Sequence, residues 1–253
     1  MPTKAKRNEN ISIDIELEGR NVEVAIVRRS TARRYILRVR AANRDVQLTM
    51  PPYGSVREAR AFAERHGDWL RARLAKLPRP RRFSNGSVVP YKGRDHVIEH
   101  HPEGRGTVWI EPGAANATVP EQDLPRLCVA GRAAHLRRRL RDWLKKEAEK
   151  ALGAAVRKYA RQLGVEFSRI SIRDQKTRWG SCSANGTLAF SWRLIMAPTY
   201  VLDYLAAHEV VHLRHMDHSK RYWRTLRELC PATDRAEAWL KAHGRDLHRY
   251  DAD

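Results

Sequence analysis

The first fifty residues alternate apolar and polar side chains, which is the period of a strand that buries one face. The alternation recurs in four short stretches, at residues 11–17, 22–26, 35–39 and 46–50. It stops at Pro51 and Pro52, since proline cannot donate a hydrogen bond to a neighbouring strand. This pattern predicts a small antiparallel sheet in the first part of the sequence.

A helical pattern takes over after the two prolines. Ser55 and Glu58 have the spacing of a capping box, and apolar residues then recur at intervals of three and four until Pro78. This spacing predicts one helix. Three later apolar runs are typical of short strands, at residues 88–89, 97–98 and 108–110. We therefore expect residues 1–118 to form a β-rich N-terminal module with one helix.

The remainder of the chain, residues 119–253, has a mainly helical pattern. Apolar intervals of three and four over residues 121–163 predict a long helix that ends at Gly164. Strand-like runs on either side of Asn185-Gly186 predict a hairpin. Three more helices are expected, with starting signals at Pro198, Ser219 and Thr233. The expected fold class is α+β, a β-rich module followed by a helical domain with a small antiparallel sheet, and no internal repeat is evident.

Composition narrows the class of protein. An apolar fraction of 42% is enough to build a core, and 49 Lys and Arg against 29 Asp and Glu give a net charge of +20. No apolar stretch approaches the length of a membrane span, and no signal peptide is evident. The three cysteines are widely spaced without a CxxC pair, which indicates neither a disulfide framework nor a cysteine zinc site. We expect a cytoplasmic protein with no membrane partner, and the charge allows weak, non-specific binding of nucleic acid.

The strongest chemical signal is the segment His208-Glu-Val-Val-His212, in the helix expected after Pro198. Histidines four residues apart lie on one helical face, so both imidazoles can reach one zinc ion. Glu209 can reach a metal-bound water without ligating the metal, which is the position that a general base requires. The motif therefore predicts a catalytic zinc site.

A catalytic zinc site needs a third protein ligand. His215 lies about 10.5 Å along the helix axis from His208, so the two would not converge on one ion. His218 is the better candidate, provided that the helix ends soon enough for the chain to turn back. A carboxylate from Glu228 or Glu237 remains an alternative.

Three motifs follow one another in the second half of the chain: Arg178-Trp-Gly-Ser-Cys182, Trp192-Arg-Leu-Ile-Met-Ala-Pro198, and His208-Glu-Val-Val-His212 with His218-Ser219 after it. Together with residues 29–39 and Trp69, they resemble the YgjP-like metallopeptidase domain, a relative of the SprT-like and WLM zinc peptidases. The resemblance implies a zincin-like metallopeptidase domain over residues 119–253. It also implies that Glu209 is the catalytic base and that three histidines bind the zinc, namely His208, His212 and His218.

We expect a zinc metalloendopeptidase in which Glu209 deprotonates a zinc-bound water that attacks the scissile carbonyl of a protein or peptide. A peptide held in extended form needs a strand edge, and Gly180 would permit its close approach. The candidate substrate-binding residues are therefore Gly180, Ser181 and Cys182. A single cysteine beside a strand is, however, more often packed as a small apolar residue. Spacing assigns no oxyanion donor, and the candidates are Tyr200, Tyr222 and Arg178.

Two other functions remain open. Some members of the resembled family are described as nucleoside triphosphate pyrophosphohydrolases that cleave UTP, but the sequence has no Gly-rich phosphate loop and no acidic cluster for Mg²⁺. The other is a nucleic-acid-binding module with a structural zinc, which the net charge would allow. The open fourth coordination position and Glu209 argue against a purely structural zinc.

Overall fold

The computed structural model describes residues 11–40, 44–77, 80–113, 124–175 and 177–251. It divides the chain into two compact units, Met1–Arg79 and Pro80–Asp253, each with a buried apolar core of its own. The boundary expected between residues 118 and 119 lies outside the described residues. The strands on both sides of it belong to the second unit.

The first unit contains a four-stranded sheet in the order β1 (Ile11–Leu17), β2 (Arg20–Arg28), β4 (Val46–Met50) and β3 (Ile36–Val39). The strands β1 and β2 form an antiparallel hairpin, and β3 pairs antiparallel with β4. The central pair, β2 and β4, is parallel because β3 lies beyond β4 instead of between them. The sheet is therefore mixed, and the expectation of a purely antiparallel sheet was wrong.

Two helices follow, α1 (Val56–Arg65) and α2 (Gly67–Ala75), where the spacing predicted one. The capping box is confirmed, since Ser55 Oγ accepts from Glu58 N and the Glu58 carboxylate accepts from Ser55 N. The break falls at His66. Its Nδ1 donates to Phe62 O at 2.8 Å, and this side chain takes up the carbonyl that an unbroken helix would pair with a backbone N–H.

The second unit begins with another four-stranded sheet, in the order β5 (Val88–Tyr91), β6 (Arg94–His101), β8 (Arg126–Ala130) and β7 (Val108–Glu111). It repeats the strand order and the pairing directions of the first sheet: an antiparallel hairpin, a parallel central pair and an antiparallel edge strand. The repeat is visible in the topology only, because the two segments share no evident sequence pattern.

The strand β8 lies where the sequence predicted the start of a long helix. Leu127, Cys128 and Val129 are all fully buried, so both faces of β8 are covered, and α3 contacts this strand. A strand buried on both faces has no alternation of apolar and polar residues, and so its pattern resembles that of a buried helix. The helix itself, α3 (Leu136–Leu163), starts later and ends as predicted at Gly164, which adopts the left-handed conformation with φ of 65°.

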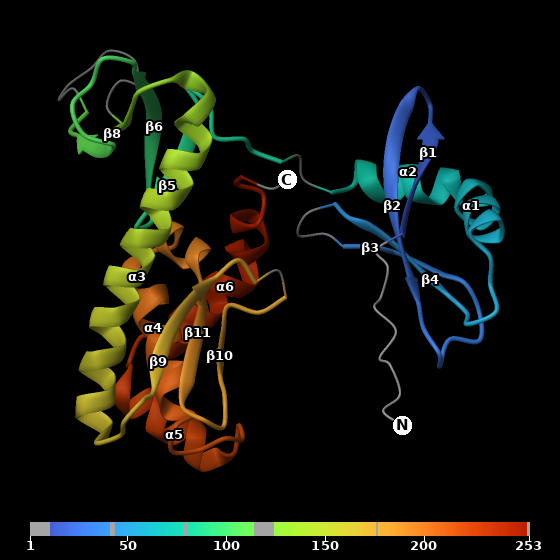
Figure 1. Cartoon of the computed structure of the whole chain (residues 1–253). Helices are drawn as coiled ribbons and strands as arrows, with labels where there is room; N and C mark the ends of the chain where they lie inside the picture. Colours follow the sequence, from blue (N-terminus) through green and yellow to red (C-terminus); the bar gives the residue numbers. More distant parts are fainter. Residues whose placement is uncertain (1–10, 41–43, 78–79, 114–123, 176, 252–253) are drawn as a thin grey trace, which may run out of the picture. The chain divides into compact units, whose positions relative to one another are not determined.

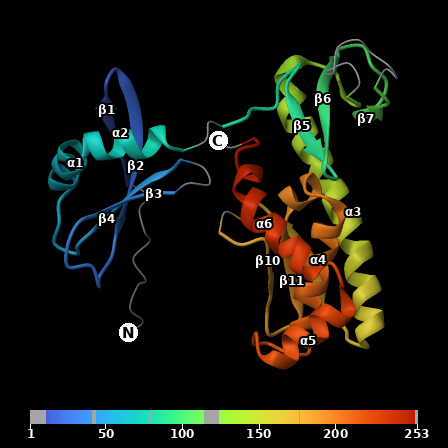
Figure 2. The same cartoon turned by 180° about the vertical axis from the view of Figure 1, so that it is seen from behind.

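Helix α3 runs from the β5–β8 sheet to the far end of the unit, past a second, three-stranded sheet (Figures 1 and 2). That sheet has the order β10 (Gly180–Cys182), β11 (Thr187–Ser191) and β9 (Arg169–Arg173). The predicted hairpin of β10 and β11 is confirmed, whereas β9 pairs parallel with β11, so this sheet is mixed as well. The strand β10 lies at its edge.

Three further helices complete the unit: α4 (Thr199–Val211), α5 (Lys220–Leu229) and α6 (Thr233–Leu247). The predicted cap at Ser219 is confirmed, because its side chain accepts from Tyr222 N. Thr233 is the first residue of α6 and not its cap, and its hydroxyl donates to Cys230 O at 2.7 Å. The fold is thus α+β, as the sequence predicted.

Two arginine side chains connect the last residues of the second unit to the rest of it. Arg193, 5% exposed, donates to Asp174 Oδ1 at 3.0 Å and to the backbone oxygen of Tyr250. Arg81, near the start of the unit, pairs with Tyr250 in a parallel bridge, and its guanidinium donates to the Tyr250 hydroxyl at 3.0 Å. The two ends of this unit therefore lie side by side.

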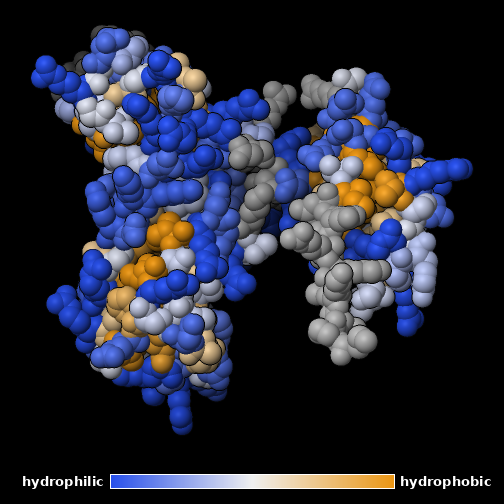
Figure 3. Space-filling view, in the orientation of Figure 1, coloured by the Kyte–Doolittle hydropathy of each residue, from blue (hydrophilic) through white to orange (hydrophobic). Residues whose placement is uncertain are grey.

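The visible surface of each unit is mainly hydrophilic, with a few apolar patches, as the many charged residues predict (Figure 3). None of the helices in the described residues combines the length and the apolar character that crossing a membrane requires.

Removing the capping box tests the stability assigned to the first unit. We expect Ser55→Ala to lower its free energy of unfolding by about 1 kcal/mol, because the start of α1 loses a side-chain acceptor. Amide hydrogen exchange in β1, β2 and β4 reports this unit separately. The matched control is Ser12→Ala, at an exposed serine of β1. Equal losses in the two variants would contradict the role of Ser55 as a cap.

Candidate metal centre

Helix α4 is the scaffold of the site. It contacts α3, α5, α6 and β10, and nine of its thirteen residues are buried. A helix that is apolar on nearly all sides is expected to lie inside a domain. The helix ends at Val211, and His212 is its C-cap, so the His208-to-His212 segment occupies the last turn.

The structure brings together the three histidines that the sequence singled out. Each offers a ring nitrogen, and these atoms all lie within 4.8 Å of one another. The Nε2 atoms of His208 and His218 are 3.4 Å apart. Two nitrogens bound to one zinc at about 2.0–2.1 Å in tetrahedral geometry are separated by about 3.4 Å. The imidazoles of His208, His212 and His218 therefore fit a tetrahedral metal ion.

His218 reaches the other two ligands because the chain reverses after α4. The N–H groups of Leu213 and Arg214 bond to carbonyls three residues earlier, each at 3.0 Å, which tightens the end of the helix. Helix α5 then starts at its Ser219 cap, directly after His218. His215 stays outside the cluster and contributes its backbone oxygen, which accepts from His212 Nδ1 at 3.0 Å.

Aromatic rings from α5 hold the ligands in place. The indole of Trp223 lies against the His218 ring, with centroids 5.7 Å apart and planes inclined by 33°. Tyr222 is fully buried, and its hydroxyl donates to the backbone oxygen of His208 at 3.1 Å. Tyr222 therefore supports the ligand helix, which leaves its hydroxyl committed and makes it a poor oxyanion donor.

Burial favours the neutral form of His208 and His212, which is the form that binds a metal. Burial and the neighbouring His212 and His218 lower the pKa of His208 to about 3. Burial also lowers the pKa of His212. An ion arriving at the site therefore meets at least two imidazoles with free lone pairs near neutral pH.

Glu209 follows His208 directly in the sequence and is not part of the cluster. It is 3% exposed, and burial raises its pKa to about 8, against the opposing effect of the Arg178 guanidinium. Its carboxylate sits against the backbone of Gly180 in β10: a Cβ added to Gly180 would lie 2.3 Å from Glu209 Oε1. Only glycine permits this close approach between strand and carboxylate.

The three candidate substrate-binding residues form β10. One edge of this strand pairs with β11, with Gly180 opposite Phe190 and Cys182 opposite Leu188, and the sheet order leaves its other edge outermost. Burial, and the nearby Glu209, raise the pKa of the Cys182 thiol, so it stays protonated. A protonated, partly buried thiol is a poor metal ligand, which favours packing as its role.

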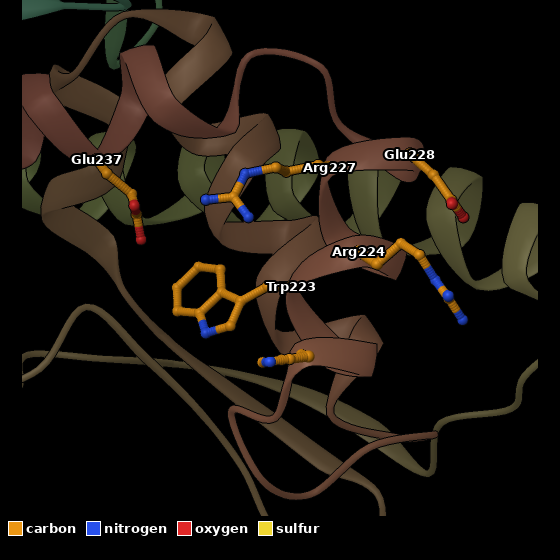
Figure 4. Close-up of a pocket in the computed structure, with 6 residues that line it drawn as sticks. Trp223, Arg224, Arg227, Glu228 and Glu237 are labelled. Atoms are coloured by element: carbon orange, nitrogen blue, oxygen red, sulfur yellow. The ribbon is translucent and has the colours of Figure 1, made fainter.

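A pocket of about 650 Å³ adjoins the cluster, lined by Lys220, Trp223, Arg224, Arg227, Glu228 and Glu237. Figure 4 shows the Trp223 indole and the Glu237 side chain on either side of this space. Trp223 also contacts His218, so this side chain is shared between the pocket wall and the surroundings of the histidines. The two glutamates considered as alternative metal ligands thus line the pocket, and neither belongs to the metal-ligand cluster found among the described residues.

Sequence reasoning overlooked Tyr204, one turn before His208 on α4. Its hydroxyl donates to Glu237 Oε1 at 2.9 Å and lies 3.3 Å from His208 Nδ1. The four-residue spacing was available from the sequence, whereas the contact with Glu237 depends on how α6 packs.

Comparisons with known proteins bear on the family to which the chain belongs. No curated protein matches the chain. The crystal structure of the metallopeptidase zymogen of Pyrococcus abyssi abylysin is similar over 39% of this chain and 97% of its own, with 21% sequence identity and a TM-score of 0.34. The family described as YgjP-like, metallopeptidase domain, matches residues 33–243, which span most of the sequence and every candidate site residue. The chain therefore belongs to the YgjP-like metallopeptidase domain family.

Proposed function

We propose that this metallopeptidase is a zinc-dependent endopeptidase with Glu209 as its general base and a zinc ion held by His208, His212 and His218. One observation carries the proposal. Three imidazole nitrogens converge within 4.8 Å, and the carboxylate of Glu209, the residue after His208, lies against β10 and is not part of this group. Three protein ligands with a separate carboxylate are typical of a catalytic zinc site, whereas a structural site has four protein ligands.

Zinc at this position supplies a Lewis acid that polarises the scissile carbonyl and acidifies water. The protein supplies the proton transfers. Glu209 accepts a proton from the attacking water and delivers it to the leaving amine. Its burial excludes competing solvent and makes the carboxylate a stronger base than an exposed glutamate.

The outer edge of β10 holds the substrate. An extended peptide adds to a sheet edge through backbone hydrogen bonds, which suits a peptidase that reads many sequences. Gly180 brings β10 close to the Glu209 carboxylate, so a peptide paired with this strand would lie near the base. Gly180, Ser181 and Cys182 are the proposed binding residues.

The triphosphate alternative finds less support. Within the part of the chain that the structure describes, the cluster suited to a metal is the three-histidine group. Histidine nitrogens suit zinc, whereas Mg²⁺ at a triphosphate prefers carboxylate oxygens. The peptidase therefore remains the proposal, and nucleoside triphosphates enter its test as competing substrates.

Nucleic-acid binding stays a prediction. Helix α3 carries ten Lys and Arg against three acidic residues, the charge bias that prompted it. Several of these arginines already have partners in the fold: Arg137 and Arg141 pair with the buried Asp251, and Arg139 donates to Ala130 O. Part of the positive charge of α3 thus stabilises the second unit and is not free to bind the phosphate groups of a nucleic acid.

Metal content tests the ligand set. We expect about one zinc per purified chain, and lower occupancy after His208→Ala, His212→Ala or His218→Ala. His215→Ala should retain the metal, because alanine keeps the backbone oxygen that accepts from His212. Elemental analysis of the purified variants measures this. Zinc loss in His215→Ala together with retention in His218→Ala would overturn the assignment.

Replacing the base tests the chemistry. Glu209→Gln should keep the fold and the zinc but hydrolyse denatured protein at least about 100-fold more slowly, since glutamine cannot accept the proton. The assay compares wild type and variant on denatured protein and on nucleoside triphosphates. Full activity in the zinc-loaded variant would show that Glu209 is not the base, and turnover of triphosphates alone would favour the alternative.

Gly180→Ala tests the placement of Glu209 while leaving this glutamate itself in the sequence. The added Cβ must displace the Glu209 carboxylate, and a shift of about 1 Å at a reacting group costs on the order of 100-fold in rate. We expect that loss in kcat with unchanged zinc content. The control is Gly153→Ala in α3, where the new Cβ meets the flexible end of Arg157 at 3.3 Å. A fully active Gly180→Ala enzyme would contradict the proposed contact.

A further inference from the structure

We propose that Tyr204 and Glu237 form a hydrogen-bonded chain that fixes the tautomer and orientation of His208, so that both act as positioning residues for the metal. The inference rests on the proposed metal centre and extends it beyond the three ligands. Tyr204 lies on α4, one turn before His208, and Glu237 comes from α6. Neither residue belongs to the metal-ligand cluster itself.

The direction of the chain follows from its proton count. A carboxylate only accepts hydrogen bonds, and a phenol has a single proton to donate. Because Tyr204 donates this proton to Glu237 Oε1 at 2.9 Å, its oxygen faces His208 as an acceptor. His208 must therefore carry its proton on Nδ1.

A proton on Nδ1 leaves the lone pair of His208 on Nε2. This is the atom that lies 3.4 Å from His218 Nε2, on the side of the ring where the metal ligands converge. The chain thus selects the one neutral tautomer that can bind the ion. It also holds the ring plane, since a rotated imidazole would lose the Tyr204 oxygen.

His212 uses the same principle with a different partner. Its Nδ1 donates to the backbone oxygen of His215 at 3.0 Å, which likewise leaves Nε2 for the metal. Two of the three ligands are therefore oriented through Nδ1, one by the backbone and one by side chains. Outer hydrogen bonds of this kind typically contribute 10- to 100-fold to metal affinity.

Burial makes the Tyr204 link hard to replace. Tyr204 is 4% exposed, so water has little access to take over the acceptor role beside His208. Glu237, in contrast, lines the pocket of about 650 Å³ next to Trp223 (Figure 4). The orientation of the half-buried His208 thus depends on a carboxylate that borders an open space.

Zinc affinity is the primary measurement, by competition with a chromophoric chelator on the full chain. We expect Tyr204→Phe and Glu237→Gln each to weaken zinc binding about 10- to 100-fold. Glu228→Gln is the matched control, because Glu228 lines the same pocket from α5, and it should bind zinc like wild type. Since Glu237 acts only through Tyr204, the double variant should bind no more weakly than Tyr204→Phe.

A second measurement separates positioning from ordinary packing. Nitrogen-15 NMR of the metal-free protein reports which ring nitrogen of His208 is protonated, and we expect Nδ1 in wild type. Glu237→Gln should shift protonation toward Nε2, because the glutamine amide can donate to Tyr204, which then turns its own proton to His208. A merely structural role would lower thermal stability and leave this tautomer unchanged.

The outcomes distinguish this inference from the proposed function. A wild-type chain without measurable zinc affinity would refute the metal centre itself. Wild-type zinc affinity in Glu237→Gln, with His208 still protonated on Nδ1, would overturn the positioning chain while leaving the peptidase proposal intact. Weaker zinc binding and a changed tautomer in Glu237→Gln, with both unaltered in Glu228→Gln, would support it.

Discussion

The proposed metal centre depends on one constraint: helix α4 must end within a residue of His212. Two histidines four residues apart can reach one ion from a single helical face. A third ligand farther along the same helix would lie about 1.5 Å farther from the ion for each added residue. The chain must therefore reverse to supply it. Helix α4 ends at Val211 and helix α5 begins at its Ser219 cap. The turn between the two helices places His218 near His208.

The remaining parts of the site come from elements that α4 touches. The strand β10 supplies the Gly180 backbone against Glu209, α5 supplies the aromatic rings behind the histidines, and α6 supplies Glu237. Because these elements surround α4, its histidines are desolvated and stay neutral. The same packing that buries the helix thus prepares its side chains for a cation.

Local signals explain what the sequence could predict. The spacing of His208 and His212, the cap at Ser219 and the left-handed Gly164 each depend on a few neighbouring residues. One error arose where distant parts of the chain decide the structure: β8 lacks alternation because both of its faces are buried. The other is local, since α1 ends where the His66 side chain takes the carbonyl of Phe62, four residues earlier.

Long-range pairing also hid two further features of the structure. Glu237 was considered only as a metal ligand, since no sequence pattern joins it to Tyr204, 33 residues earlier. The common topology of the two four-stranded sheets was equally invisible, because it lies in the order and direction of the strands. The identity of the side chains alone determines neither the contact of Tyr204 with Glu237 nor the order of the strands.

The bridge between Arg81 and Tyr250 bears on the order of folding. These residues are 169 positions apart, whereas His208 and His218 are separated by ten. Loop-closure entropy grows as the logarithm of that separation, so joining the ends costs about 2.5 kcal/mol more than closing the ligand turn. High contact order delays such a contact until the intervening core has formed. The turn between His208 and His218 can thus form early in folding, whereas the bridge between Arg81 and Tyr250 forms late.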